Sequence, residues 1–143
     1  MKPKLPKKKC IKAIKKRARN IFSKLVRLKN SVDGYCTCVT CGQSNSIKNT
    51  HAGHYIHALL PTLFDETNVH PQCVACNTYR SGNLTKYALW LERNYYPGIL
   101  QELEIKSNQS IKISYPQYEQ MIDMWKEEIK DIETGKGLFY DRD

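Results

Sequence analysis

The clearest pattern in the chain is a stripe of apolar side chains between Cys10 and Asn30. The apolar residues recur at steps of three or four positions, at Ile11, Ile14, Ala18, Ile21, Leu25 and Leu28. This is the spacing of one face of an α-helix. Lysine and arginine fill many of the other positions, so we expect an amphipathic helix that packs on the body of the protein and turns a basic face to solvent.

Further helical stripes follow nearer the C-terminus. One begins at Leu84 and is expected to end before Pro97-Gly98, and a short helix is expected over residues 99–104. The last helix should begin after Ser114, which can cap it, with Pro116 in its first turn. Its predicted packing face comprises Tyr118, Met121, Ile122, Trp125, Ile129 and Ile132.

Shorter elements are predicted between these helices. Residues 35–39 have the pattern of a strand, and residues 49–57 can form a second strand that pairs with it in a hairpin. We expect a loop over residues 59–66, and a helical turn that starts near Cys73 and breaks near Ser81-Gly82. The pattern therefore predicts an α+β fold.

Composition and length limit the class of protein. The chain has 143 residues, of which 41% are hydrophobic and 26% charged, which favours a folded domain over disorder. No apolar run reaches the roughly 18 residues of a membrane span, and residues 1–7 are not followed by the apolar stretch of a secretory signal. We therefore expect a cytosolic protein with no membrane partner, whose cysteines are metal ligands or buried thiols.

The net charge of +9 is concentrated at the N-terminus. Residues 1–30 hold thirteen lysines and arginines and no acidic residue, whereas residues 101–143 carry a surplus of four negative charges. A basic block of this kind binds phosphate backbones without reading base sequence, although a solvated helix face has the same composition. The candidate DNA-binding residues on this helix are Lys12, Lys15, Lys16 and Arg19.

Two Cys-x-x-Cys pairs form the most specific motif. Cys38 and Cys41 make one pair, and Cys73 and Cys76 make the other. Each pair can present two thiolates from one tight turn, and Gly42 suits the first turn because glycine tolerates a positive φ. Four thiolates close a tetrahedral zinc site with no open position, which predicts a structural Zn²⁺. A redox role is disfavoured because no thioredoxin-like pattern accompanies the motifs.

Histidine and asparagine residues cluster between and around the two cysteine pairs. His51 and His54 lie between the pairs, Asn68 precedes the second pair, and Asn77 follows it directly. A phosphodiester nuclease needs a base that deprotonates water and a divalent cation that stabilises the developing negative charge. Any single histidine is more often a packing or surface residue, so these positions alone do not establish such a site.

The joined motifs resemble those of the phage NinG/Rap family of recombination endonucleases. The matching run has Cys-x-x-Cys-Gly at 38–42, Ala-Gly-His-Tyr at 52–55, Asn-Val-His-Pro-Gln-Cys-x-x-Cys-Asn at 68–77 and Ser-Gly-Asn at 81–83, followed by Tyr87. That family is a zinc-stapled relative of the HNH, or ββα-metal, nucleases. The resemblance covers about residues 28–98 and implies a small HNH-like core, flanked by the basic helix and by C-terminal helices.

The resemblance also implies roles for individual residues. His54 corresponds to the general base, at the end of the second strand of the predicted hairpin, and Asn68 to the asparagine that holds the loop and orients the base. Asn77 corresponds to a ligand of the catalytic Mg²⁺ or Mn²⁺. HNH enzymes often carry a ligand just before the base, where this chain has Gly53, which supplies none. His51 is the first candidate to replace it, and His70 and Asn83 are others.

These inferences lead to a definite functional hypothesis. The chain is expected to have a basic arm and amphipathic helix at 1–30, a zinc-stapled HNH-like core at 31–97 and a C-terminal helical region at 98–143. By resemblance it would be a metal-dependent endonuclease that cuts branched recombination intermediates, such as Holliday junctions or D-loops, and leaves 5′-phosphate ends. Arg80 and Lys86 are candidates to bind flanking phosphates, with a solvated helix face as the alternative for both.

Two other readings of the same residues remain open. One is a zinc-containing nucleic-acid-binding module without catalysis, and the other is a zinc-stapled protein-interaction domain that docks through its acidic C-terminal helix. A homodimer through Met121 and Trp125, an intramolecular packing of the same face, and recombination proteins as partners are further possibilities. A phage-encoded protein of this kind would act in the cytoplasm of the host cell.

Overall fold

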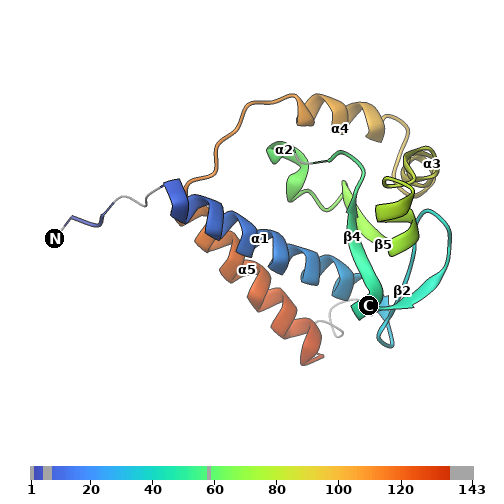
Figure 1. The fold of residues 1–143 in the computed structure, drawn as a ribbon, viewed down its shortest axis with the longest axis horizontal. Helices are drawn as coiled ribbons and strands as arrows, with labels where there is room; N and C mark the ends of the chain where they lie inside the picture. The colour runs from blue at the N-terminus through green and yellow to red at the C-terminus, as the bar shows by residue number, and fades with distance from the viewer. Residues whose placement is uncertain (1, 5–7, 58, 136–143) are drawn as a thin grey trace, which may run out of the picture. The chain divides into compact units, whose positions relative to one another are not determined.

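The computed structural model describes residues 2–4, 8–57 and 59–135, and its fold is mixed α+β (Figure 1). Much of the predicted basic arm at residues 1–8 lies outside the described residues. No helix in the described part of the chain is long and apolar enough to cross a bilayer. The elements are α1 (Lys8–Lys29), β1 (Ser31–Val32), β2 (Tyr35–Thr37), β3 (Ser44–Ser46), η1 (Ile47–Asn49), β4 (Thr50–His54), α2 (Leu60–Leu63), β5 (Val69–Cys73), η2 (Ala75–Tyr79), α3 (Leu84–Asn94), α4 (Ile99–Ser107) and α5 (Tyr115–Glu133).

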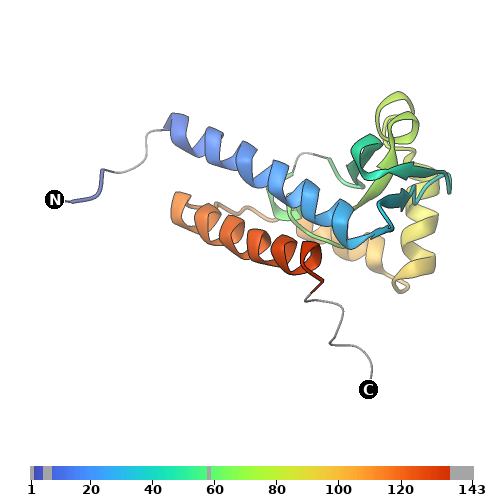
Figure 2. The same ribbon diagram turned by 90° about the horizontal axis from the view of Figure 1, so that it is seen from below.

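The chain divides into two compact units. The first comprises Met1–Leu25 and Lys112–Asp143, and the second Val26–Ile111. This division differs from the three consecutive segments expected from the sequence, because α5 returns to pack beside the first part of α1 (Figures 1 and 2). The rings of Phe22 and Trp125 lie 5.0 Å apart between these two helices.

The first unit follows the apolar pattern of its two helices. The predicted stripe of α1 is buried at Ile14, Ala18 and Leu25, and Phe22 is buried beside it. The predicted face of α5 is buried at Tyr118, Ile122, Trp125 and Ile129, so Trp125 packs within the chain. Ser114 caps α5 as expected and forms a capping box with Gln117, which satisfies two backbone N–H groups.

The strands of the second unit pair differently from the prediction. The expected hairpin between residues 35–39 and 49–57 is wrong, because β2 pairs with β1 and β3 in a small antiparallel sheet. β4 instead pairs with β5 along its whole length, from Thr50 opposite Cys73 to His54 opposite Val69. His54 therefore ends the first strand of a β4–β5 hairpin, and not the second strand of the hairpin that was expected.

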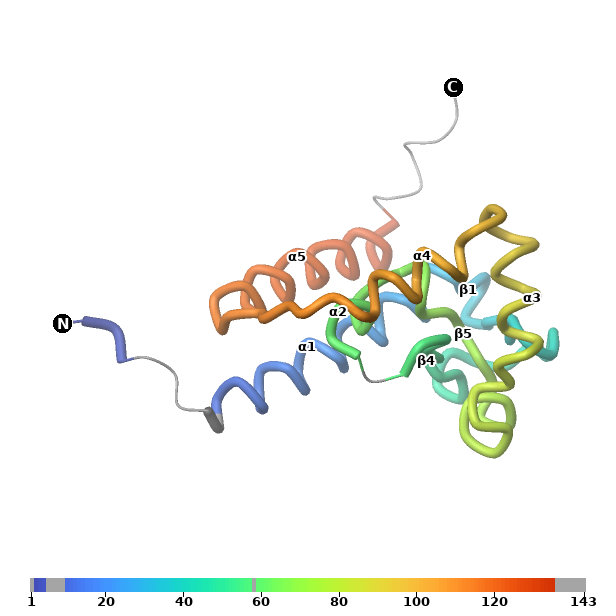
Figure 3. Tube along the Cα trace, turned by 90° about the horizontal axis from the view of Figure 1, so that it is seen from above, coloured from blue at the N-terminus to red at the C-terminus, as the bar shows by residue number. Residues whose placement is uncertain are grey.

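The connection between β4 and β5 and the elements after β5 complete this unit. The segment expected to be a loop, residues 59–66, contains the short helix α2, with Pro61 in its first turn (Figure 3). After β5 the chain makes the π-helical turn η2, and it breaks near Ser81-Gly82 as predicted before α3 begins. The core of the unit is built from Tyr87, Leu91, Ile99 and Leu103.

Candidate functional site

The four predicted cysteines converge on one point. The sulfur atoms of Cys38, Cys41, Cys73 and Cys76 all lie within 4.8 Å of one another, and those of Cys41 and Cys73 are 3.7 Å apart. A tetrahedral Zn²⁺ with Zn–S bonds near 2.3 Å places its sulfurs about 3.8 Å apart. The cluster therefore fits a zinc ion, and it ties the turn after β2 to the end of β5 and to η2.

Polar groups near the cluster favour the thiolate form of Cys76, whereas burial raises the pKa of the Cys41 and Cys73 thiols. Burial raises the pKa of the Cys76 thiol, but hydrogen bonds from Thr40 and Asn83 outweigh it and hold that pKa at about 6. The Asn83 amide donates to Cys76 Sγ at 3.5 Å, and the Arg80 guanidinium donates to the same sulfur at 3.8 Å. Such donors orient ligating sulfurs and offset their charge. Asn83, a candidate ligand of the catalytic ion, thus contacts a sulfur atom of the zinc cluster.

The remaining two cysteines stand outside this cluster. The thiol of Cys36 is buried and lies 3.3 Å from the carbonyl oxygen of Arg27. Cys10 is exposed on α1. The ligand set is therefore the one that the spacing of the two Cys-x-x-Cys pairs predicted.

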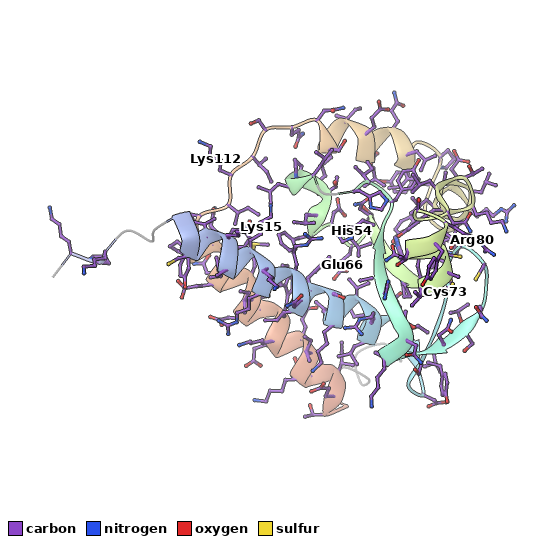
Figure 4. The ribbon with its side chains drawn as sticks, in the orientation of Figure 1. Lys15, His54, Glu66, Cys73, Arg80 and Lys112 are labelled. Atoms are coloured by element: carbon purple, nitrogen blue, oxygen red, sulfur yellow. The ribbon has the colours of Figure 1, made fainter. Side chains whose placement is uncertain are left out.

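His54, the predicted base, is held by the connection that follows its strand. Its ring extends from the end of β4 to α2, where Nε2 lies 2.9 Å from the carbonyl oxygen of Leu63 (Figure 4). A carbonyl oxygen can only accept a hydrogen bond, so Nε2 carries the proton in the neutral ring. The lone pair of His54 is then on Nδ1, which is the nitrogen that can take up a proton.

Asn68 fastens the same connection. Its side chain is fully buried, its Oδ1 accepts a hydrogen bond from the backbone N–H of Ile56, and its Nδ2 donates to the carbonyl oxygens of Ile56 and Thr62. Thr62 is the neighbour of Leu63, whose carbonyl contacts His54. Asn68 thus fixes the backbone next to the carbonyl group that contacts the histidine ring.

His51 and Asn77 meet across the gap between β4 and η2. Nδ2 of Asn77 lies 2.9 Å from Nδ1 of His51. The amide nitrogen only donates, so Nδ1 holds the ring's lone pair, and rotation of the carboxamide would present its oxygen to the same space. A neutral imidazole nitrogen and an amide oxygen, together with water, form a donor set that Mn²⁺ or Mg²⁺ accepts. The two residues predicted to bind the divalent ion thus lie next to each other.

His70 is placed elsewhere, in an aromatic pocket of the same unit. Its Nδ1 lies 2.9 Å from the hydroxyl of Tyr87 and its Nε2 lies 2.7 Å from that of Tyr95, and its ring packs against Trp90. The Tyr87 hydroxyl donates to the carbonyl oxygen of Gly53, so it must accept from Nδ1, and Tyr95 then donates to Nε2. Burial lowers the pKa of His70 to about 4. His70 is a neutral packing residue and has no nitrogen left for the ion.

Gln72 is a buried polar residue that the sequence pattern did not single out. It is fully buried and lies opposite His51 in the β4–β5 pairing. Its Nε2 donates to Thr40 at 3.2 Å and to the carbonyl oxygen of Gly82 at 2.8 Å, whereas its Oε1 has no hydrogen-bond partner among the described residues. The sequence offered only a lone glutamine between Pro71 and Cys73 as a signal, because the burial of this strand is apparent only from the fold.

The predicted DNA-binding residues lie on helical surfaces. Lys12, Lys16 and Arg19 are exposed on α1, and Lys15 is half-buried on the same helix (Figure 4). Lys86 is exposed on α3. Arg80 is also exposed, directly after η2, but its guanidinium is partly engaged by Cys76. These positions are compatible with phosphate contacts and do not by themselves establish them.

Comparison with known proteins decides the family. The family model described as "Bacteriophage Lambda NinG protein" matches residues 1–135. The chain belongs to the NinG family. The match includes both cysteine pairs, the β4–β5 hairpin and the helices that form the other unit.

Curated relatives of this NinG family member come from several phages. The chain is 41% identical over 73 residues to "Protein ninG" of Escherichia phage 933W, which is 50% of the chain and 36% of that protein. It is 42% identical over 69 residues to "Protein ninG" of Salmonella phage P22, covering 47% and 34%. "Protein ninG" of Escherichia phage lambda is 40% identical over 73 residues, covering 50% and 35%. The matched stretch thus spans about a third of each relative, and no solved structure matches the chain.

Proposed function

We propose that this protein is a metal-dependent DNA endonuclease with an HNH-like core, and that it acts on branched recombination intermediates. The observation that carries the proposal is the contact between His54 and the carbonyl oxygen of Leu63, which assigns the proton to Nε2 and the lone pair to Nδ1. A histidine held in one tautomer by a backbone carbonyl is prepared to act as a general base.

The order of the surrounding elements supports an HNH-like core. An antiparallel hairpin, β4–β5, is followed by the helical segments η2 and α3, and the three predicted residues fall on its successive parts. His54 ends the first strand, Asn68 lies in the connection, and Asn77 lies in η2. The zinc cluster at the end of β5 holds η2 to the hairpin and so limits the position of Asn77.

Divalent cation chemistry would come from Mg²⁺ or Mn²⁺ bound near His51 and Asn77. Such an ion, when bound, stabilises the negative charge that develops on the phosphate and on the leaving 3′ oxygen. Neither side chain supplies a negatively charged oxygen, so a phosphate oxygen of the substrate would add one to the ligands of the ion. This property would couple ion binding to DNA binding.

The reaction itself is a hydrolysis. Nδ1 of His54 takes a proton from a water molecule while the water oxygen forms a bond to phosphorus. The bond from phosphorus to the 3′ oxygen breaks, and the leaving oxygen takes a proton from solvent. The products are a 5′-phosphate and a 3′-hydroxyl.

DNA binding is proposed to involve two separate surfaces of the protein. Lys12, Lys15, Lys16 and Arg19 would bind one stretch of backbone, and Arg80 and Lys86 would bind phosphates that flank the cleaved bond. Basic side chains at such positions bind by releasing counterions and carry no base specificity. Two duplex contacts suit a branched substrate better than a plain one. We also propose that the protein forms a homodimer and that it binds recombination proteins.

The proposal is tested by incubating the protein with linear, flapped and four-way DNA, with Mg²⁺, with Mn²⁺ and with a chelator that leaves the zinc cluster loaded. We expect cutting of the branched substrates that requires the added ion, with 5′-phosphate at the new ends. DNA binding without cutting under every condition would favour the non-catalytic zinc module instead. Equal cutting of all three substrates would support the assignment as a nuclease but contradict the proposed preference for branched DNA.

A further inference from the structure

The least explained polar group among the described residues is the carboxamide oxygen of Gln72. The side chain is fully buried, yet this oxygen has no hydrogen-bond partner within the described part of the chain. Leaving a buried acceptor unpaired costs about 1–3 kcal/mol, so such groups are rare unless something else binds them. A fully buried acceptor without a partner therefore points to a ligand.

The orientation of the carboxamide follows from its neighbours. One of its donors points to the carbonyl oxygen of Gly82 at 2.8 Å, and a carbonyl oxygen can only accept. The nitrogen must therefore face Gly82, and the oxygen must face the opposite side. There it lies against Gly53: a Cβ atom added to this glycine would stand 2.0 Å from Oε1 and 2.7 Å from Cδ of Gln72. The oxygen of Gln72 thus occupies the place of a side chain at position 53.

The position of this oxygen relates it to the two ion-ligand candidates. Gln72 is the direct cross-strand partner of His51, so their side chains leave the hairpin on the same face. Gly53 is two residues further along β4 and shares that face. The buried oxygen therefore lies on the side of the hairpin where Nδ1 of His51 meets Asn77. It also lies beside the residue that directly precedes His54.

We propose that Gln72 supplies, through Oε1, an oxygen ligand to the divalent ion of the candidate site, in place of the ligand that a side chain at position 53 would give. The inference rests on the proposed function, because it completes the ion site assigned there to His51 and Asn77. It explains why residue 53 is glycine: any larger residue would displace the Gln72 carboxamide. The ligands of the ion would then extend along β4 from His51 to Gly53, which directly precedes His54.

The test is a titration of the zinc-loaded protein with Mn²⁺, followed by electron paramagnetic resonance of the free ion. Mn²⁺ prefers oxygen ligands and binds a given site more weakly than Zn²⁺ does, so it leaves the four-thiolate cluster loaded with zinc. Gln72→Ala is expected to weaken Mn²⁺ binding about tenfold or more, as loss of one ligand or its support does. Gln43→Ala, at an exposed position, is the matched control and should bind Mn²⁺ as the wild type does.

A second variant tests the position of the ligand. Gly53→Asp in the Gln72→Ala background places a carboxylate where the carboxamide oxygen was. Gly53 does not have a positive φ, so its backbone accepts a side chain once the glutamine is gone. We expect this double variant to recover Mn²⁺ binding to the wild-type level or tighter. Should Gln72→Ala not fold, Gln72→Glu keeps the length and the oxygen and is expected to bind Mn²⁺ more tightly.

The outcomes separate this inference from the proposed function. If His51→Ala and Asn77→Ala weaken Mn²⁺ binding while a folded, zinc-loaded Gln72→Ala binds as the wild type does, the ion site stands and Gln72 is only a structural link. If none of the three variants changes Mn²⁺ binding, the ion site of the proposed function fails, and the inference fails with it. Unchanged binding in Gln72→Glu would overturn the inference as well.

Discussion

Nε2 of His54 lies 2.9 Å from the carbonyl oxygen of Leu63, in the connection that joins the two strands of the β4–β5 hairpin. The same connection is fixed by Asn68, which hydrogen-bonds the backbone at Ile56 and Thr62. The orientation of the candidate base therefore depends on a buried asparagine in the same connection.

Asn68→Ala is expected to destabilise the protein by about 2–4 kcal/mol, because three backbone groups would lose their partner in a buried site. Urea unfolding of the zinc-loaded protein measures this change. Asn94→Ala removes one exposed hydrogen bond to Trp90 and serves as the control, with an expected change below about 0.5 kcal/mol. Equal stability of the two variants would contradict the role given to Asn68.

Cys73→Ser should abolish zinc binding and unfold the second unit, since closed zinc sites contribute on the order of 10 kcal/mol to folding. Metal analysis of the purified protein should give one zinc per wild-type chain and none in the variant. Cys36→Ser is the matched control, because Cys36 is buried but lies outside the cluster. A folded, zinc-free Cys73→Ser protein would show that the four thiols are not a structural site.

Tyr95→Phe removes the hydroxyl group that donates to Nε2 of His70. The nitrogen would remain buried without a donor, and we expect a loss of about 1–3 kcal/mol in the free energy of unfolding. The control is Tyr96→Phe, at the neighbouring exposed tyrosine, whose hydroxyl contacts Glu102. Thermal unfolding of both variants checks the prediction, and identical midpoints would mean that the contact between Tyr95 and His70 contributes nothing.

The basic face of α1 can be tested through the salt dependence of DNA binding. Replacing Lys12, Lys16 and Arg19 by Gln should lower the slope of log K against log salt by up to about 2.7, if each side chain neutralises one phosphate. The charge-matched control replaces Lys112, Lys126 and Lys130, which are exposed in the C-terminal segment. Equal slopes for the two triple variants would reduce the α1 face to a role in solubility.

The sequence was most informative where the pattern is local. The apolar stripes of α1 and α5, the cap at Ser114 and the two Cys-x-x-Cys turns each depend on residues within a few positions of one another. Strand pairing was not local in this sense. β5 contains His70, Pro71 and Gln72 and has no alternating apolar pattern, because all of its residues are buried. The strand partner of β4 was therefore missed.

The wrong strand pairing also hid part of the candidate site. Without the β4–β5 register, nothing indicated that Gln72 lies opposite His51 or that its carboxamide fills the space beside Gly53. His70 was a candidate ligand because of its type and position in the sequence, and only the fold shows that two tyrosines occupy its ring nitrogens. Contacts between residues far apart in the sequence decide both points.

The most direct test of the account is single-turnover cleavage of a four-way junction by His54→Ala, compared with His57→Ala. His57 is an exposed histidine three positions further along, which controls for loss of an imidazole in this region. General-base catalysis contributes about 10²- to 10⁴-fold, so the account predicts a rate loss of that size for His54→Ala with unchanged DNA binding and zinc content. A rate within a few-fold of wild type would contradict the assignment of His54 as the base.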